Sequence, residues 1–145
     1  MYPSVWAADT FAPAPEPECS GGCILAIVGS QHMRGNSVAE QHIRDAFDQH
    51  QPRHFVSGGE PTGIDLMAEE EADRRSVSKT IHLPEQKGWE WYKKRDLLIA
   101  QDAECLVRIF SGTARTYGSG YTANEAEKLG ARVTRIKVGD GPAPY

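Results

Sequence analysis

The chain has 145 residues, of which 39% are hydrophobic, and its formal net charge at pH 7 is -4. This length suits one domain with a core of ordinary size, and the negative charge disfavours a general nucleic-acid binder, which usually carries a basic stripe. No run of about 18 apolar residues occurs, so we expect no membrane-spanning helix. The N-terminus lacks a basic segment followed by an apolar one, so we expect no secretory signal and a cytoplasmic protein.

Both ends of the chain differ in composition from its middle. Residues 11–22 (FAPAPEPECSGG) alternate proline with small and acidic residues. Such a stretch cannot bury enough apolar area to offset its ordering entropy, so residues 1–22 are predicted to form a flexible arm. The folded domain is predicted over 23–138, and residues 139–145 are predicted to form a second frayed end.

The chain has three cysteines, Cys19, Cys23 and Cys105. An odd number without a secretory signal indicates reduced thiols. Cys19 and Cys23 are spaced as the start of a metal site could be, but no Cys/His pair at zinc-finger spacing follows them, so we expect no metal and no cofactor. Cys105 opens an apolar run and is interpreted as a small core residue.

The first half of the domain alternates strand and helix. The apolar, β-branched run ILAIV predicts a buried strand over 24–28. The segment SVAE (37–40) has the capping-box pattern and predicts the start of a helix that ends near His50. A second strand is predicted over 54–57 and a second helix over 64–75.

The second half continues in the same way. Strands are predicted over 79–83, 105–110 and 132–138, with helices over 89–103 and 122–129. The last strand alternates polar and apolar residues, which is typical of an edge strand. The predicted fold class is therefore α/β, an open, mainly parallel five-stranded sheet with helices on both faces.

Three loops at the carboxyl ends of predicted strands carry small residues. They are Gly29-Ser30, the segment SGGEPTG (57–63) and the segment YGSGYT (117–122). The carboxyl ends of parallel strands meet at one edge of the sheet, where α/β proteins bind ligands. The loops are therefore either tight turns or a cradle of backbone N–H groups for an anion such as phosphate.

Four segments together resemble the SLOG superfamily: AIVGS (26–30), VSGGEPTGID (56–65), KKRDLLIAQDAECLVRI (93–109) and GSGYTANEAEKLGARV (118–133). This group includes the DNA-processing protein A (Smf) domain, the Lonely-guy phosphoribohydrolases and small stand-alone proteins of the YspA type. The resemblance implies a Rossmann-like fold, a nucleotide site at these loops and a homo-oligomer. The Lonely-guy pattern PGGxGTxxE is matched at Gly118, Thr122 and Glu125, and Arg95-Asp96 stands where the family has Arg-Asn.

The candidate ligand-binding residues lie in or beside these segments: Gly29, Ser30, Ser57, Gly58, Gly59, Gly63, Asp65, Arg95, Gly118, Ser119, Gly120 and Thr122. Each has a structural alternative. The glycines can serve turn geometry alone, and Asp65 can stabilise the first turn of its helix. Thr122 and Glu125 have capping-box spacing, and Arg95, the best candidate cation for a phosphate, can instead face solvent.

Other side chains near the loops are weaker candidates. Arg34 and Arg115 lie in loops from which they could reach the ligand, whereas His32 is interpreted as a surface residue. The aromatic cluster Trp89, Trp91 and Tyr92 can stack on a base, or pack against the sheet or a partner subunit.

Three functions remain open at this point. The preferred one is binding of a nucleotide or nucleotide-derived small molecule, with its phosphate on the Gly58–Gly63 loop and the Gly118–Thr122 loop and with Arg95 supplying positive charge. The alternative is hydrolysis of the N-glycosidic bond of a nucleoside 5'-monophosphate, with Glu125 and Arg95 as catalytic residues. The third, single-stranded DNA binding, is disfavoured by the net charge of -4.

Overall fold

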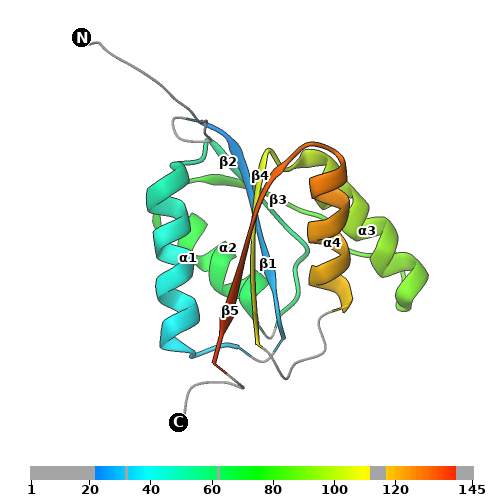
Figure 1. Ribbon diagram of the computed structural model, residues 1–145, viewed down its shortest axis with the longest axis horizontal. Coiled ribbons are helices and arrows are strands. Elements are labelled where there is room, and N and C mark those ends of the chain that lie inside the picture. The colour runs from blue at the N-terminus through cyan, green and yellow to red at the C-terminus, as the bar shows by residue number, and fades with distance from the viewer. Residues whose placement is uncertain (1–21, 32, 62, 112–116, 140–145) are drawn as a thin grey trace.

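The computed structural model describes residues 22–31, 33–61, 63–111 and 117–139. Strands and helices alternate along this part of the chain (Figure 1). In order, the elements are β1 (Ile24–Gly29), α1 (Ser37–His50), β2 (His54–Ser57), α2 (Ile64–Arg74), β3 (Ser78–Ile81), α3 (Trp89–Asp102), β4 (Cys105–Ser111), α4 (Tyr117–Lys128) and β5 (Arg132–Val138). The arm predicted over residues 1–22 lies outside the described residues except for Gly22, and so does the tail from residue 140.

The five strands form one parallel sheet in the order β3-β2-β1-β4-β5. The predicted α/β fold is confirmed, and the arrangement is Rossmann-like. Strands β1, β2 and β3 progress in one direction from the centre, and β4 and β5 progress in the other. The strand order therefore reverses between β1 and β4, where Gly29 pairs with Ile109 at the carboxyl end. Crevices at such reversal points are where α/β proteins bind ligands.

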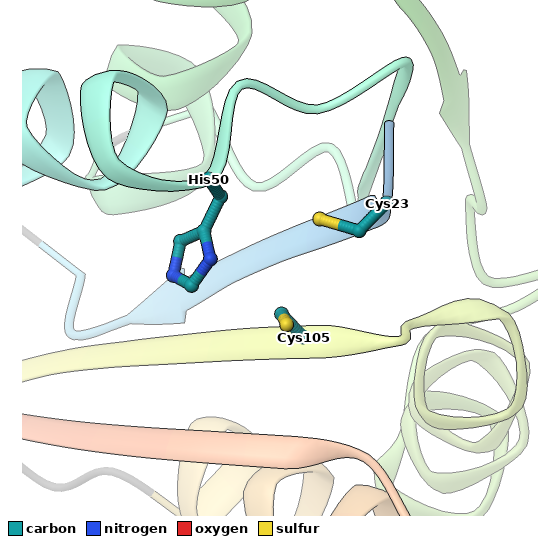
Figure 2. Close-up of side chains that lie close together, drawn as sticks. All are labelled: Cys23, His50 and Cys105. Atoms are coloured by element: carbon teal, nitrogen blue, oxygen red, sulfur yellow. The ribbon is translucent and has the colours of Figure 1, made fainter. Parts of the chain in front are cut away.

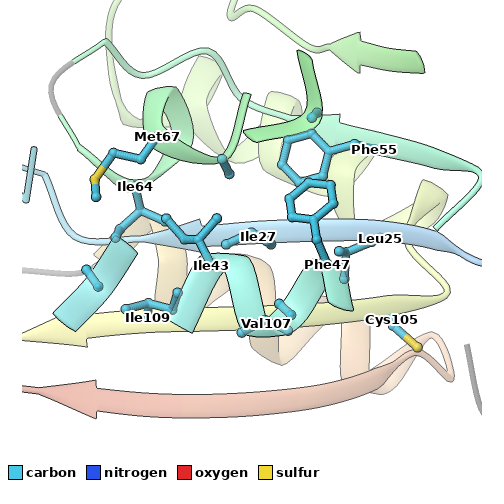
Figure 3. Packing of buried hydrophobic residues seen from close by; sticks show 14 of the residues in the cluster. Leu25, Ile27, Ile43, Phe47, Phe55, Ile64, Met67, Cys105, Val107 and Ile109 are labelled. Atoms are coloured by element: carbon cyan, nitrogen blue, oxygen red, sulfur yellow. The ribbon is translucent and has the colours of Figure 1, made fainter. Parts of the chain in front are cut away.

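Each face of the sheet buries its own apolar layer. Helices α1 and α2 cover one face, where Leu25, Ile27 and Phe47 belong to the core (Figures 1 and 3). Helices α3 and α4 cover the other face, where Ala26 and Val28 are buried. Alternate residues of β1 thus face opposite helical layers, which is why its sequence is apolar without a break. Full burial of each large apolar side chain stabilises the fold by roughly 1.5–3 kcal/mol.

Helix α1 is capped one residue earlier than predicted. The N-cap is Asn36, whose side-chain Oδ1 accepts the N–H groups of Val38 and Ala39, both at 3.0 Å. The predicted capping box starting at Ser37 is therefore wrong, because Ser37 is already inside the helix. An asparagine oxygen caps a helix as well as a serine oxygen does, so the neighbouring residue takes the role.

Two other elements have a boundary that differs from the prediction by more than one residue. Strand β3 spans Ser78–Ile81 rather than 79–83. Helix α4 begins at Tyr117 rather than at 122, so the third small-residue loop is in fact the first turns of a helix. Thr122 is a helical residue whose Oγ1 donates to the Gly118 carbonyl at 2.7 Å, and its predicted capping role is wrong.

The early start of α4 has a tertiary cause. Gly118 and Gly120 disfavour a helix by about 1 kcal/mol each relative to alanine. However, a Cβ at Gly118 would lie only 3.5 Å from the Asp96 carboxylate on α3, so this turn of α4 passes close to α3. Close contact between the helices therefore overrides local propensity. None of the described helices is long and apolar enough to cross a membrane.

Candidate functional site

A cleft of about 440 Å³ lies at the carboxyl edge of the sheet, beside the reversal of strand order. Its walls come from the ends of β1 and β2, the first turn of α2, one side of α3 and the first turns of α4. Eight of the predicted ligand-binding residues line it: Gly29, Gly58, Gly59, Asp65, Arg95, Gly118, Ser119 and Thr122. Segments far apart in the sequence therefore converge as expected from the parallel sheet.

Two of the glycines at this edge are required by packing. A Cβ at Gly29 would lie 2.1 Å from the carbonyl oxygen of Ile109, and a Cβ at Gly63 would lie 2.4 Å from that of Ser30. Both distances are far below van der Waals contact, so the sheet edge and the start of α2 can approach only without side chains at these positions. The presence of glycine here is thus explained by geometry, whether or not a ligand binds.

The Gly58–Gly63 loop directs two of its backbone donors towards the protein itself. The Gly59 N–H donates to Ser57 Oγ at 3.2 Å, and the Glu60 N–H donates to Asp65 Oδ2 at 3.2 Å. Gly59 has a φ of 76°, which suits glycine. Because these two N–H groups already have acceptors, a phosphate would have to displace Ser57 and Asp65 to bind them.

Arg95 joins α3 to the end of β2. Its Nε donates to Asp96 Oδ1 at 2.6 Å, and its Nη1 donates to the Gly58 carbonyl at 2.5 Å. The Arg95 side chain is only 14% exposed, so it forms part of the cleft wall and does not face solvent. The guanidinium predicted to bind phosphate therefore also has a structural task, which is to fix the loop after β2 against α3.

Asp65 is a buried carboxyl group in the first turn of α2. Burial raises the pKa of Asp65 from 3.8 to about 7, although the Glu60 N–H and the nearby Arg95 guanidinium act in the opposite direction. Near neutral pH this group can therefore carry or release a proton. A carboxyl group with such a pKa inside a cleft is suited to binding a polar ligand or to acid–base chemistry.

Asp96 has a buried oxygen without a partner. The residue is 4% exposed, and its Oδ1 pairs with Arg95, whereas its Oδ2 has no hydrogen-bond partner among the described residues. Burial also raises the pKa of Asp96, opposed by Arg95 and by the nearby Thr122 hydroxyl. That hydroxyl has a single proton, which it donates to the Gly118 carbonyl, so Oδ2 is left without a donor. An unsatisfied buried acceptor costs roughly 1–3 kcal/mol, which a ligand donor could recover. The sequence analysis noted Asp96 only as a departure from Arg-Asn and missed it as a site residue.

Acidic side chains outnumber basic ones in the cleft. Among the described residues that line it, Glu60, Asp65 and Asp96 are acids and Arg95 is a cation. Carboxyl groups in a buried setting attract hydrogen-bond donors and repel anions. This arrangement favours hydroxyl or amino groups of a ligand over a bare phosphate.

Aromatic and apolar side chains also line the cleft. Trp89 and Tyr92, from the first turn of α3, line it together with Leu83. Trp89 is 43% exposed and makes an edge-to-face contact with Tyr121, with ring centroids 5.7 Å apart. An exposed indole of this kind offers a surface for a planar ring. Trp91, also considered for stacking, does not line the cleft.

Four predicted ligand-binding residues, Ser30, Ser57, Gly63 and Gly120, do not line the cleft. Ser30 Oγ accepts the Ser111 N–H at 3.1 Å, which ties β1 to β4. Ser57 Oγ donates to the Glu69 carboxylate. These hydroxyl groups therefore bond to other parts of the protein rather than to the cleft.

The predicted catalytic residue Glu125 also does not line the cleft. It forms an ion pair with Lys128 at 3.1 Å on α4. Arg34 pairs with Glu70 at 3.4 Å on the surface and does not line the cleft either. The interpretations of His32 and Arg115 concern positions outside the described residues.

No family model matches the chain, and a search of curated proteins finds none similar in sequence. The fold and the cleft define a Rossmann-like α/β protein with an acidic cleft at the reversal of its strand order. The resemblance to the SLOG superfamily rests on the motif residues alone.

Proposed function

We propose that the cleft binds a nucleotide or nucleotide-derived small molecule, and that it recognises mainly the nucleoside part. The observation that carries this proposal is the unpartnered Oδ2 of Asp96, buried in the cleft wall beside Asp65 and Arg95. Because this oxygen is buried, a ligand hydroxyl or amino group would reach and satisfy it with a small shift of the cleft wall. The motif resemblance to the SLOG superfamily supports the same class of ligand.

A ribose and a base fit the two kinds of side chain that line the cleft, carboxyl groups and aromatic rings. Carboxylates near the carboxyl ends of Rossmann strands are suited to ribose hydroxyls, and Asp65 and Asp96 supply two of them. Trp89 and Tyr92 offer aromatic surface for the base. A volume of about 440 Å³ lies in the range of small-molecule sites.

Phosphate recognition would contribute little to this binding. Two N–H groups of the loop after β2 are engaged by Ser57 and Asp65, and Asp96 lies close to the amino end of α4, where a phosphate would otherwise be favoured. We therefore expect a nucleoside to bind at least as tightly as its 5'-monophosphate.

The test is to titrate the protein with a panel of nucleosides and their monophosphates. Binding is measured by isothermal titration calorimetry and by tryptophan fluorescence. Asp96→Asn removes the carboxylate and should weaken binding by at least about tenfold, the value of one hydrogen bond to a charged group. Glu90→Gln is the matched control, because Glu90 lies on the same helix with its side chain 79% exposed. Trp89→Phe should abolish the fluorescence change if the base lies against this indole.

A second candidate, hydrolysis of the N-glycosidic bond, is favoured by one observation. Burial raises the pKa of Asp65 to about 7 in the cleft, so this group could protonate a leaving base near neutral pH. In this version the catalytic carboxyl group is Asp65, acting as a general acid, whereas the sequence motif had Glu125 stabilise positive charge on the ribose. Mass-spectrometric detection of free base after incubation with the panel decides between binding and hydrolysis. Release that is lost in Asp65→Asn but kept in Glu125→Gln would establish the hydrolase.

A further inference from the structure

A second cluster of reactive side chains lies at the opposite edge of the sheet from the cleft. Cys23 precedes β1, His50 is the last residue of α1, and Cys105 is the first residue of β4 (Figure 2). One ligand atom from each residue, two sulfurs and an imidazole nitrogen, lies within 4.8 Å of the others. The three residues are 5%, 6% and 1% exposed, respectively.

The backbone around the cluster is held by hydrogen bonds. The Arg53 N–H donates to the Cys23 carbonyl at 2.9 Å. Ile24 and Glu104 are joined twice, because the Glu104 N–H donates to the Ile24 carbonyl at 2.9 Å and the Ile24 N–H donates to Glu104 Oε1 at 3.0 Å. The residues next to both cysteines are therefore fixed relative to each other, so little ordering would be needed to bring the sulfurs onto one ion.

The donor set matches the preference of zinc. Thiolate sulfur and imidazole nitrogen are its usual structural ligands. Two thiolates, one neutral imidazole and a divalent ion sum to zero charge, so the complex avoids the cost of burying a net charge. In a tetrahedral site with Zn–S bonds of about 2.3 Å, two sulfurs lie about 3.8 Å apart, so the cluster needs to contract by at most roughly 1 Å.

The sulfur of Cys105 is already bonded in this structure. Cys105 forms a disulfide bond, whereas Cys23 has a free thiol. The expectation that all cysteines are reduced is therefore wrong for Cys105 in this structure. Before Cys105 can bind a metal, the disulfide must take up two electrons and two protons from a reductant such as a small dithiol.

We propose that the reduced protein binds one zinc ion through Cys23, His50 and Cys105, and that the disulfide at Cys105 excludes the metal. On binding, the two thiols release two protons to solvent and their sulfurs bond to the ion. A water molecule or a further side chain completes the tetrahedron. Cys19 is outside the described residues and is not counted among the ligands. The bound ion would cross-link the carboxyl end of α1 to the amino ends of β1 and β4.

The sequence analysis missed this site because the ligands are distant in the chain. It tested Cys19 and Cys23 for the short spacing of zinc fingers and found no second pair. His50 was used only as the end of a helix. Only the parallel pairing of β1 with β4, together with the return of α1 across the sheet, brings the three side chains together.

The first experiment uses metal-free full-length protein reduced with a phosphine reductant and titrated with Co²⁺. We expect a visible spectrum typical of tetrahedral thiolate coordination at one ion per chain, displaced by Zn²⁺, and no such spectrum from the oxidised protein. Cys23→Ser, His50→Ala and Cys105→Ser should each weaken Zn²⁺ binding by on the order of 100-fold or more. His42→Ala, on the same helix, should bind as the wild type does.

The second experiment, X-ray absorption at the zinc edge of the wild type, does not depend on whether the variants fold. We expect two sulfur ligands at about 2.3 Å and nitrogen or oxygen ligands at about 2.0 Å. Absence of a thiolate spectrum in the reduced protein would overturn the proposal. So would unchanged affinity in the three ligand variants, or a zinc shell without sulfur.

Discussion

Replacing Asp65 with asparagine should stabilise the protein at neutral pH. Burial raises the pKa of Asp65 from 3.8 to about 7, so the folded state favours the protonated group and the unfolded state favours the ionised one. Stability that is fully present below pH 3.8 is therefore lost as the pH rises to about 7. At about 1.4 kcal/mol per pKa unit, the difference between 3.8 and about 7 corresponds to a loss of about 4 kcal/mol.

Asparagine removes this loss because it does not ionise, and its carbonyl oxygen can still accept the Glu60 N–H. The assay is urea unfolding followed by circular dichroism at several pH values between about 4 and 8. The stability of Asp65→Asn relative to wild type should rise by roughly 2–4 kcal/mol across this range and then level off. Asp45→Asn, at an exposed position on α1, should show no such rise. If the free energies of unfolding of Asp65→Asn and wild type differ by the same amount at every pH, the raised pKa of Asp65 is refuted.

Four further predictions concern other parts of the chain. Gly29→Ala should lower the free energy of unfolding by at least about 2 kcal/mol in urea, because the added Cβ would lie 2.1 Å from the Ile109 carbonyl oxygen. Asn36→Ala should lower the free energy of unfolding by about 1 kcal/mol in the same assay, because the N-cap of α1 is lost. Asn36→Asp should keep most of the wild-type stability, because aspartate also caps helices. Arg95→Gln leaves the buried Asp96 carboxylate without its ion pair, so unfolding experiments should find it more destabilising at mildly alkaline than at mildly acidic pH. Labelled single-stranded DNA should not change mobility with the protein at low salt, since the net charge is -4.

The fold was predictable because its centre obeys simple patterns. Strand β1 lies between two helical layers, so both of its faces are apolar, and the alternation of strands with helices implies a parallel sheet. Edge strand β3 has weaker patterning, since none of its residues is buried, and its boundary was misplaced. Local signals become less specific where fewer side chains enter the core.

The start of α4 could not be predicted from local propensity. Gly118 and Gly120 indicated a loop, but the apolar packing of α4 against α3 favours a helix there, and no local rule includes that packing. The consequence extends to the site, because Thr122 enters the cleft from a helix and Glu125 falls outside it.

The sequence predicted where the cleft lies but not which of its groups are free to contact a ligand. Glycine-rich segments indicated the correct edge of the sheet, because parallel strands bring their carboxyl ends together. The sequence could not show that loop N–H groups are used by Ser57 and Asp65, or that Asp96 is buried with one oxygen unsatisfied. Those features depend on side-chain orientation and burial, which only the folded chain determines. They change the expected ligand contact from phosphate to hydroxyl or amino groups.

The most direct test of the proposed function is a calorimetric titration of wild type, Asp96→Asn and Glu90→Gln with the nucleoside that binds best in the panel. The account predicts saturable binding to the wild type and to Glu90→Gln, with at least about tenfold weaker binding to Asp96→Asn. It also predicts that the corresponding monophosphate binds no more tightly than the nucleoside. Equal affinity in all three proteins, or no binding of any nucleoside or nucleotide, would contradict it.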